Sequence, residues 1–418
     1  MPPKVYAIAT MATKGEELTF VRQQLERAGA SVVTVDVGTS LPPTAEATIP
    51  RETVAACHPQ GAGFVLSQTD RGAAVDAMAE ALRVYLLREF EQGHVQGAIG
   101  LGGTGGTSLI TKALRALPVG LPKLMVSTVA SGNVAPYIDC SDIVMMPSVV
   151  DVAGINAVSS RILANAAHAM AGMVAHEAPT LALKPIVGMT MFGVTTACVT
   201  AVRTKLENQG FDCLVFHATG TGGRAMEKLV ESGLIKGVLD ITTTEVADEV
   251  VGGVFRAGPD RFDAILKSRI PYVMSLGALD MVNFGAPETV PAEFRSRRLH
   301  KHNSQVTLMR TTAEENRQFA HWIAAKLKRA AAPVIVLVPE GGVSALDAPG
   351  QSFHDPAADA AFLEEFLAAV QGIEAVKVVR RPQHINDPAF ADALVDEFRQ
   401  QWDAREKARL LTTLPGTA

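Results

Sequence analysis

Residues 100–108 form a run of glycine and hydroxyl side chains, Gly-Leu-Gly-Gly-Thr-Gly-Gly-Thr-Ser, whose chemistry suits a bound phosphate. The run lies between an apolar segment at 97–99 and a segment at 109–117 with helical spacing. Glycine lets a backbone approach an anion closely, and the first turn of a helix leaves N–H groups that point toward it. A tight turn that needs only small residues is the alternative. We favour phosphate binding and assign it to Gly102, Gly103, Thr104, Gly105, Gly106 and Thr107.

The same run also matches a dinucleotide-binding fingerprint, through the spacing of Gly100, Gly102 and Gly105. That fingerprint belongs after the first strand of its domain, with an acidic residue about 20 residues further on. Here the run follows a third predicted strand, and the next acidic residue is Asp139. The glycine-lysine-serine or glycine-lysine-threonine sequence of a P-loop does not occur. The pattern therefore favours a phosphate-bearing ligand other than NAD.

Polar residues also follow the other predicted strands of the first half. Lys14 stands at a helix start, where a cation opposes the helix dipole unless an anion accompanies it, although the two glutamates that follow also balance its charge. Asp36 ends a strand and has the position either to accept hydrogen bonds from ribose hydroxyls or to cap a turn. Hydroxyl donors come from Thr10, Ser127 and Ser131. We assign these five residues to the same cofactor-binding site.

In the second half, we assign a catalytic role to His217, Glu245, Asp280 and Glu340, all of which follow predicted strands. A histidine titrates near neutral pH and suits acid-base catalysis, and carboxylates gathered at one sheet edge would complete such a site. A structural role is the alternative for each residue. The glycine-rich segment 219–223 is a candidate second anion pocket, whereas the basic segment from Arg295 to Asn303 is expected to be a solvated loop.

The elements that position these residues are predicted from a repeat. A β-α-β pattern at 5–37 returns between residues 184 and 216, and its helix repeats with an offset of 181, so that Leu25 matches Leu206 and Gly29 matches Gly210. Third and fourth strands follow in both halves, and a fifth pair is predicted at 143–146 and 306–309. Continuous apolar strands are typical of parallel sheets that are covered on both faces. We therefore predict an α/β fold of two duplicated, doubly wound, Rossmann-like subdomains that face each other across a cleft.

The subdomains are predicted at 1–180 and 181–418, the second with extra strands and helices at its C-terminal end. The net charge of −5 and the 5% aromatic content argue against nucleic-acid binding. The four cysteines lack the paired spacing of a zinc site or disulfide framework. No signal peptide or membrane-spanning segment is recognised, so a cytoplasmic protein without a membrane partner is expected.

Several motifs together resemble one family: residues 8–16, 35–38, 100–107, 216–223 and 338–344. It is a bacterial and plant family that includes the ATP-binding region of a tomato protein conferring resistance to tomato mosaic virus. The resemblance spans the whole chain and implies two Rossmann-like subdomains, with ATP bound in the first by residues 102–107. It also implies a homodimer. The plant protein carries a barrel-like domain, so a separate barrel-domain protein is an expected partner here, and antiviral activity is not carried over.

We therefore expect an ATP-dependent enzyme of small-molecule metabolism, with its co-substrate in the cleft between the subdomains. Mg²⁺ is considered as a companion of ATP, with Asp139, Asp142 and Asp151 as the acidic residues in question, and no metal ligand is assigned. The alternative is a nucleotide-responsive binding or scaffold protein without turnover. An NAD-dependent oxidoreductase is a third alternative, which the position of the glycine run disfavours.

Overall fold

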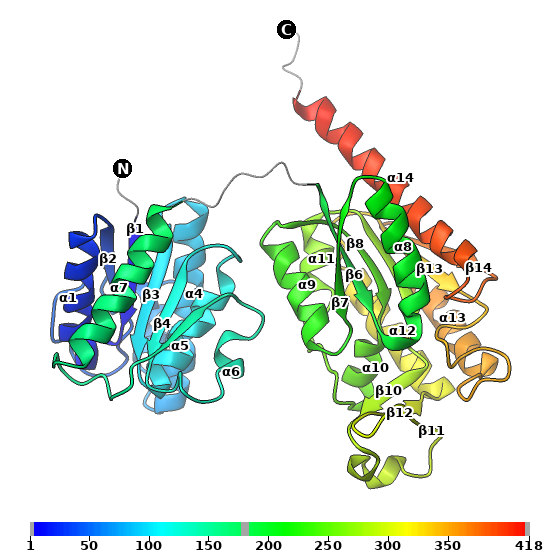
Figure 1. Ribbon diagram of the computed structural model, residues 1–418, viewed down its shortest axis with the longest axis horizontal. Helices are drawn as coiled ribbons and strands as arrows, with labels where there is room; N and C mark the ends of the chain where they lie inside the picture. The colour runs from blue at the N-terminus through cyan, green and yellow to red at the C-terminus, as the bar shows by residue number, and fades with distance from the viewer. Residues whose placement is uncertain (1–3, 177–183, 414–418) are drawn as a thin grey trace. The chain divides into compact units, whose positions relative to one another are not determined.

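The computed structural model describes residues 4–176 and 184–413, which belong to two compact units, Met1–Leu181 and Ala182–Ala418. Each unit is a parallel β-sheet with helices on both faces (Figure 1). The predicted α/β fold class is therefore confirmed, and the two units are consistent with duplicated Rossmann-like subdomains. The predicted cleft between the units stays a prediction. No helix within the described ranges is long and apolar enough to cross a membrane.

Unit 1 has a five-stranded parallel sheet in the order β2-β1-β3-β4-β5. Its strands are β1 (Lys4–Ala9), β2 (Ser31–Asp36), β3 (Gly97–Gly102), β4 (Lys123–Ser127) and β5 (Val144–Pro147). Its helices are α1 (Met11–Arg27), α2 (Arg51–Ala55), α3 (Gly61–Leu66), α4 (Arg71–Glu91), α5 (Thr104–Ala116), α6 (Ala135–Ile138) and α7 (Ser159–Ala175).

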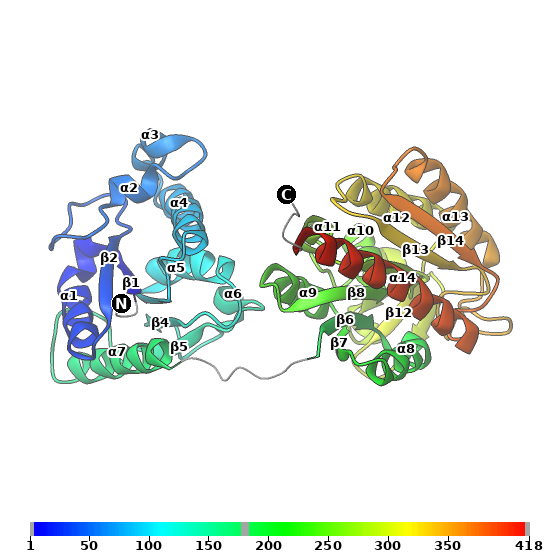
Figure 2. The same cartoon turned by 90° about the horizontal axis from the view of Figure 1, so that it is seen from above.

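Alternating side chains of β1 explain how the unit 1 sheet is covered. Val5 and Ala7 pack in one buried cluster with residues of α1 and α7. Tyr6 and Ile8 point the other way and pack with residues of α4 and α5. Figure 2 shows the two pairs of helices on opposite faces of the sheet. The carboxyl ends of the strands, and therefore the glycine run, lie along one edge of this sandwich.

Unit 2 has a six-stranded parallel sheet in the order β14-β13-β9-β8-β6-β7 and a small antiparallel sheet, β10-β12-β11. The large sheet contains β6 (Ile186–Met191), β7 (Asp212–His217), β8 (Ile235–Thr242), β9 (Tyr272–Gly277), β13 (Val334–Pro339) and β14 (Val376–Arg381). The small sheet contains β10 (Met281–Phe284), β11 (Leu299–Lys301) and β12 (Thr307–Arg310).

Helices cover both faces of the large sheet of unit 2. Residues of α8 (Thr196–Asn208) and α14 (Pro388–Thr413) share a buried cluster on one face. The other face is covered by α9 (Thr221–Glu231), α10 (Thr244–Val251), α11 (Asp263–Ser268), α12 (Ala313–Leu327) and α13 (Pro356–Val370). Short 3₁₀ turns lie at Gly193–Thr195, Pro287–Thr289 and Ala292–Phe294.

The repeat is visible in the strand order, because β2-β1-β3-β4 of unit 1 corresponds to β7-β6-β8-β9 of unit 2. Gly29 and Gly210 both end a helix with a φ of 90°. The predicted fifth pair is wrong for unit 2: residues 307–310 form β12 of the small sheet, and β13 takes the place beside β9. A short apolar run does not tell which sheet it joins, and here β12 pairs antiparallel with β10 and buries Leu308.

Candidate functional site

The glycine run of unit 1 forms the turn from β3 into α5. A Cβ atom on Gly102 would lie 2.9 Å from the Thr107 nitrogen, so this turn requires glycine. The Thr107 N–H donates to the Gly103 carbonyl at 2.8 Å, which is the first hydrogen bond of the helix. The N–H groups of residues 104–106 precede it and have no helical acceptor. The first turn of α5 also contains no acidic residue, so the positive end of its dipole lies open.

Space is left above this first turn, and polar atoms border it. A Cβ atom added to Gly105 would lie 4.0 Å from Arg71 Nη2. One added to Gly106 would lie 3.8 Å from the Leu101 carbonyl oxygen and 4.0 Å from Thr10 Oγ1. Arg71 is exposed at the start of α4, where the N-cap residue Asp70 accepts a hydrogen bond from the Ala73 N–H at 2.8 Å. Asp70 thus supplies a carboxylate at the start of α4, whereas the first turn of α5 has no acidic residue and is favourable for an added anion. The arrangement therefore suits a phosphate group.

A pocket of about 650 Å³ lies beside this turn. Its lining includes the predicted residues Gly103, Thr104 and Ser131, together with Thr128 and Asp151. A pocket of this volume accepts a ligand of nucleotide size. The wall at residues 147–151 contains Val149, which has a φ of 64° although it is β-branched. Left-handed backbone at such a residue is strained and often marks a functional loop.

Two predicted ligand residues position the loops instead of lining the pocket. Thr107 and Ser127 are both fully buried, and their hydroxyl oxygens lie 2.6 Å apart. The Ser127 hydroxyl also accepts a hydrogen bond from the Val129 N–H at 3.1 Å. These bonds join the loop after β4 to the first turn of α5. Ser127 therefore acts on the pocket through the residues that follow it.

Asp36 and Lys14 are likewise engaged within unit 1. Asp36 is buried, and its Oδ1 atom accepts hydrogen bonds from the N–H groups of Met11 and Gly38, both at 2.9 Å. It thus fixes the loops that follow β1 and β2. The Lys14 ammonium donates to the Val152 carbonyl and holds the segment next to Asp151. Neither side chain lines the pocket beside α5.

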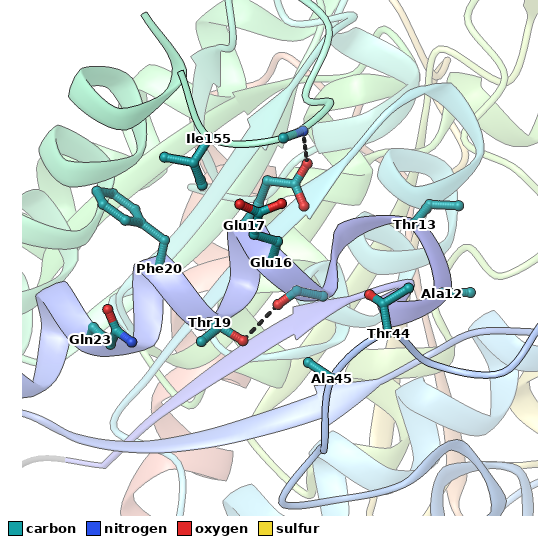
Figure 3. Close-up of a pocket in the computed structure, with 12 residues that line it drawn as sticks. Ala12, Thr13, Glu16, Glu17, Thr19, Phe20, Gln23, Thr44, Ala45 and Ile155 are labelled. Atoms are coloured by element: carbon teal, nitrogen blue, oxygen red, sulfur yellow. Dashed lines mark hydrogen bonds between the residues drawn. The ribbon is translucent and has the colours of Figure 1, made fainter. Parts of the chain in front are cut away.

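A second pocket of unit 1, of about 680 Å³, lies along α1 and is drawn in Figure 3. Its charged side chains are those of Glu16 and Glu17. Glu17 is buried and accepts a hydrogen bond from the Gly154 N–H at 2.8 Å, the dashed line beside Ile155 in Figure 3. Two carboxylates repel phosphate, whereas the pocket beside α5 has one, Asp151, and lies next to the first turn of α5. The pocket beside α5 is therefore the more favourable phosphate site.

Of the three aspartates considered for magnesium, only Asp151 lines the pocket beside α5. Asp142 forms an ion pair with the Lys123 ammonium at 2.6 Å. Burial raises the pKa of Asp142, but its bonds to Lys123 and to the Gly120 N–H outweigh burial and lower the pKa. Within residues 4–176 and 184–413, no three histidine, cysteine or acidic side chains form a metal-binding group.

In unit 2, Glu245 is fully buried and bonded to the main chain. Its Oε1 atom accepts from the N–H groups of Gly220 and Gly223 at 2.8 and 3.2 Å, and its Oε2 atom accepts from Arg261 Nε at 2.9 Å. The glycine-rich segment 219–223 therefore already holds an anion, a carboxylate of its own chain. This segment resembles the glycine run of unit 1 in sequence but is not open in the same way.

The other three predicted catalytic residues lie in different surroundings. His217 is exposed and lines a pocket of about 180 Å³ with Phe192 and His302. Asp280 is buried and accepts a hydrogen bond from the Ser344 hydroxyl at 2.7 Å. Glu340 accepts from Arg380 Nε at 2.9 Å. The Ser344 hydroxyl thus connects Asp280 to the loop that begins at Glu340. Glu245 instead pairs with Arg261, at a different place in unit 2.

The basic segment is not a free solvated loop throughout. Arg297 forms a two-pronged ion pair with Glu315, with N···O distances of 3.0 and 2.8 Å. His302 reaches the turn after β6, because a Cβ atom on Gly193 would lie 4.0 Å from its ring. Residues 299–301 form β11, so the small antiparallel sheet holds the segment in place.

Sequence reasoning missed Arg71, Thr128 and Arg261. Arg71, like Lys14, is a cation at a helix start. It was not considered because it is far from the glycine run in sequence. Thr128 lies inside the hydroxyl-rich loop that was recognised after the fourth strand. No local pattern points to Arg261, whose importance comes from the three carboxylates that the fold gathers around it.

Comparison with known proteins covers both units. The model of "Uncharacterised protein family (UPF0261) N-terminal domain" matches residues 3–179, and that of the C-terminal domain matches residues 184–402. A UPF0261 protein of Rhizobium meliloti is 55% identical over 95% of this chain and 98% of its own length. One of Clostridium tetani is 47% identical over 95% and 98%. The tomato "ToMV resistance protein Tm-1(GCR237)" of Solanum lycopersicum is 49% identical over 95% of this chain but only 55% of its own length.

Proposed function

The chain belongs to the UPF0261 family, and from this premise and the geometry of unit 1 we propose that it binds ATP and uses it to convert a small molecule. ATP would be held in unit 1, with its phosphates at the first turn of α5. The observation that carries the proposal is the open helix N-terminus, bordered by the exposed Arg71 guanidinium and the Thr10 hydroxyl.

The residues present fit such a ligand. The N–H groups of Thr104, Gly105 and Gly106 would receive phosphate oxygens, and Arg71 would supply the positive charge. Thr128 and Ser131 line the adjoining pocket and offer hydroxyl groups to the rest of the nucleotide. A magnesium ion that accompanies the phosphates would meet Asp151. ATP would supply a transferable phosphoryl or nucleotidyl group.

For the reaction itself, His217 and Glu340 are the predicted catalytic residues that line pockets. Glu245 and Asp280 are fully buried and hold loops in place. We therefore propose that acid-base work falls to His217 or Glu340 and that the two buried carboxylates support the structure around them.

A charge placed at Gly105 tests the ATP site. In Gly105→Asp, a carboxylate in the first turn of α5 favours the helix but repels phosphate, so the fold is kept while ATP affinity falls at least tenfold in calorimetric titration. Gly105→Ser, which adds a side chain without charge, is the matched control. Equal affinity for ATP in Gly105→Asp and wild type would refute the site.

Arg71→Gln gives an independent test, with Arg88→Gln at the opposite end of α4 as its control. We expect weaker ATP binding only in Arg71→Gln. Release of ADP or AMP in the presence of candidate small molecules then separates an enzyme from the alternative, a nucleotide-responsive scaffold. Tight binding of NADH in place of ATP would favour the oxidoreductase alternative.

A further inference from the structure

Unit 2 contains a largely apolar pocket of about 580 Å³, which we call the α13 pocket. It lies where β13 ends, between that strand end and helices α12 and α13, which cover the same face of the sheet (Figure 2). Its apolar lining includes Leu276, Leu279, Val338, Phe362, Leu363 and Leu367. Open parallel sheets bind ligands beyond the carboxyl ends of their strands, and this volume falls in the range of small-molecule pockets.

Polar groups meet at one side of the α13 pocket. Asn316 is buried, and its amide nitrogen donates to Thr311 Oγ1 and to the Thr312 carbonyl at 3.0 and 2.9 Å. Asn316 is also one of the residues that line the pocket. His354 also lines the pocket. Its buried Nδ1 atom lies 3.8 Å from the Asp347 Oδ1 atom, too far for a hydrogen bond.

Asp359 adds a third polar group to this side of the pocket. It accepts from Arg310 Nη2 at 2.7 Å. Burial raises the pKa of Asp359 to about 8, and Asp347 adds to the increase although Arg310 opposes it. The Asp359 carboxyl group lines the pocket and is held in place by Arg310. Polar side chains thus converge on an apolar cavity, the usual composition of a small-molecule site.

The charges around the pocket narrow the class of ligand. Arg380 is the only lysine or arginine among the described lining residues, and Glu340 already pairs with it. Glu364, at the same pocket, is exposed and negative. An anionic ligand would therefore meet a carboxylate without a free cation to balance it. The apolar lining, with Arg380 already paired, instead matches an uncharged molecule.

We propose that the α13 pocket binds a small uncharged molecule with a hydrocarbon body and one hydroxyl or carbonyl group, which bonds to Asp359, Asn316 or His354. The site belongs to unit 2 alone and does not rest on ATP binding by unit 1. Glu340, which is also proposed above as an acid-base residue, lines this pocket together with its ion-pair partner Arg380.

Four probes with the same ring test the ligand class: cyclohexanol, cyclohexanone, cyclohexanecarboxylate and cyclohexylammonium. Binding is measured by saturation-transfer NMR on the full chain. We expect cyclohexanol and cyclohexanone to bind at least tenfold more tightly than the carboxylate, with the amine not exceeding the neutral probes. Equal binding of the carboxylate and the alcohol, or tighter binding of the amine, would overturn the proposed class.

Two substitutions on α13 test the place of binding. Ala360 lines the pocket, whereas Ala357 is exposed on the same helix and does not. We expect Ala360→Trp to abolish binding of cyclohexanol and Ala357→Trp to keep it. Leu363→Trp, one turn further along, blocks the pocket from a second position should Ala360→Trp fold poorly. Binding that survives in folded Ala360→Trp or Leu363→Trp refutes the site, and ATP titration of the same variants keeps this result separate from unit 1.

Discussion

Glu245 illustrates at the residue scale why two similar loops behave differently. Its carboxylate lies at the N–H groups of Gly220 and Gly223, where a phosphate would otherwise lie. Gly223 is needed because a Cβ atom there would lie 2.3 Å from the Glu245 Oε2 atom. The glycine run of unit 1 follows β3, whose counterpart in unit 2 is β8, whereas segment 219–223 follows β7. Glu245 lies in the first turn of α10, the helix that follows β8, and the first turn of α5 contains no acidic residue.

Arg261 neutralises three buried carboxylates, so its removal should be costly. Its nitrogen atoms lie 2.7 Å from Asp240, 2.9 Å from Glu245 and 3.2 Å from Glu227. We expect Arg261→Met to lower the free energy of unfolding of unit 2 by about 3–5 kcal/mol at pH 8 in urea titration. The loss should shrink at pH 5, because burial raises the pKa of Glu227 to about 7 even with Arg261 present.

The control for this prediction is Arg203→Met. Arg203 pairs with Glu207 on the surface of α8, where both side chains are well exposed. Surface pairs of this kind contribute about 0–1 kcal/mol. A loss in Arg261→Met no larger than that in Arg203→Met would contradict the role given to Arg261.

Asp280 should give unit 2 a distinctive pH dependence. Burial and Asp347 raise the pKa of Asp280 from its ordinary value of 3.8 to about 7, although Arg310 opposes the change. Between these pH values the folded chain binds more protons than the unfolded chain, so the free energy of unfolding falls as pH rises. We expect Asp280→Asn to remove up to about 1.4 kcal/mol per pH unit of that slope.

Urea titrations from pH 4 to 8 measure this slope in both proteins. Glu227, Asp248 and Asp359 also have raised pKa values, but they are present in wild type and variant alike and cancel in the comparison. Parallel curves for the two proteins would mean that Asp280 ionises alike in the folded and unfolded chains.

At the scale of elements, the glycines at the junction between β3 and α5 differ in how closely the surrounding backbone packs against them. Gly102 is in close contact with the backbone of residues 106 and 107, whereas Gly106 has room for a side chain. We expect Gly102→Ala to destabilise unit 1 by about 1–3 kcal/mol through overpacking. Gly106→Ala should instead stabilise it by about 0.5–1 kcal/mol, because alanine favours a helix. Thermal unfolding followed by circular dichroism compares them, and similar shifts in both variants would contradict this assignment.

Much of this element arrangement could be predicted from sequence, because apolar runs alternate with helical spacing and the two halves repeat. The turn from β3 into α5 was located from its glycines alone. The position of β12 was not predictable, since a four-residue apolar run fits either sheet. Arg71 and Arg261 were missed because their partners come from other elements, and the inward direction of the Glu245 side chain leaves no local signal.

For the whole molecule, the two units have separate buried cores, so they should unfold separately. Both tryptophans, Trp322 and Trp402, belong to unit 2, so their fluorescence follows that unit alone while circular dichroism follows both. We expect ATP at a hundredfold excess over its dissociation constant to stabilise unit 1 by about 2.7 kcal/mol. The midpoint of the fluorescence transition, which reports on unit 2, should not change.

Gly105→Asp supplies the control, since ATP should shift neither of its transitions. Arg261→Met supplies the reverse case: the unfolding transition of unit 2, seen by fluorescence, should shift, and the transition of unit 1, seen by circular dichroism, should not. A shift of the tryptophan transition with ATP in wild type would place the nucleotide in unit 2 or couple the two units.

The carboxylate that Glu245 provides to unit 2 has a consequence for the lifetime of the protein in the cell. In unit 2, the anion at segment 219–223 is the side chain of Glu245, so it is in place as soon as the unit folds. Unit 1 would have to obtain its anion from the surrounding nucleotide pool. When ATP is scarce, we expect proteases to cut unit 1 first, because degradation follows the population of open states. The abundance of the intact chain would then follow nucleotide supply.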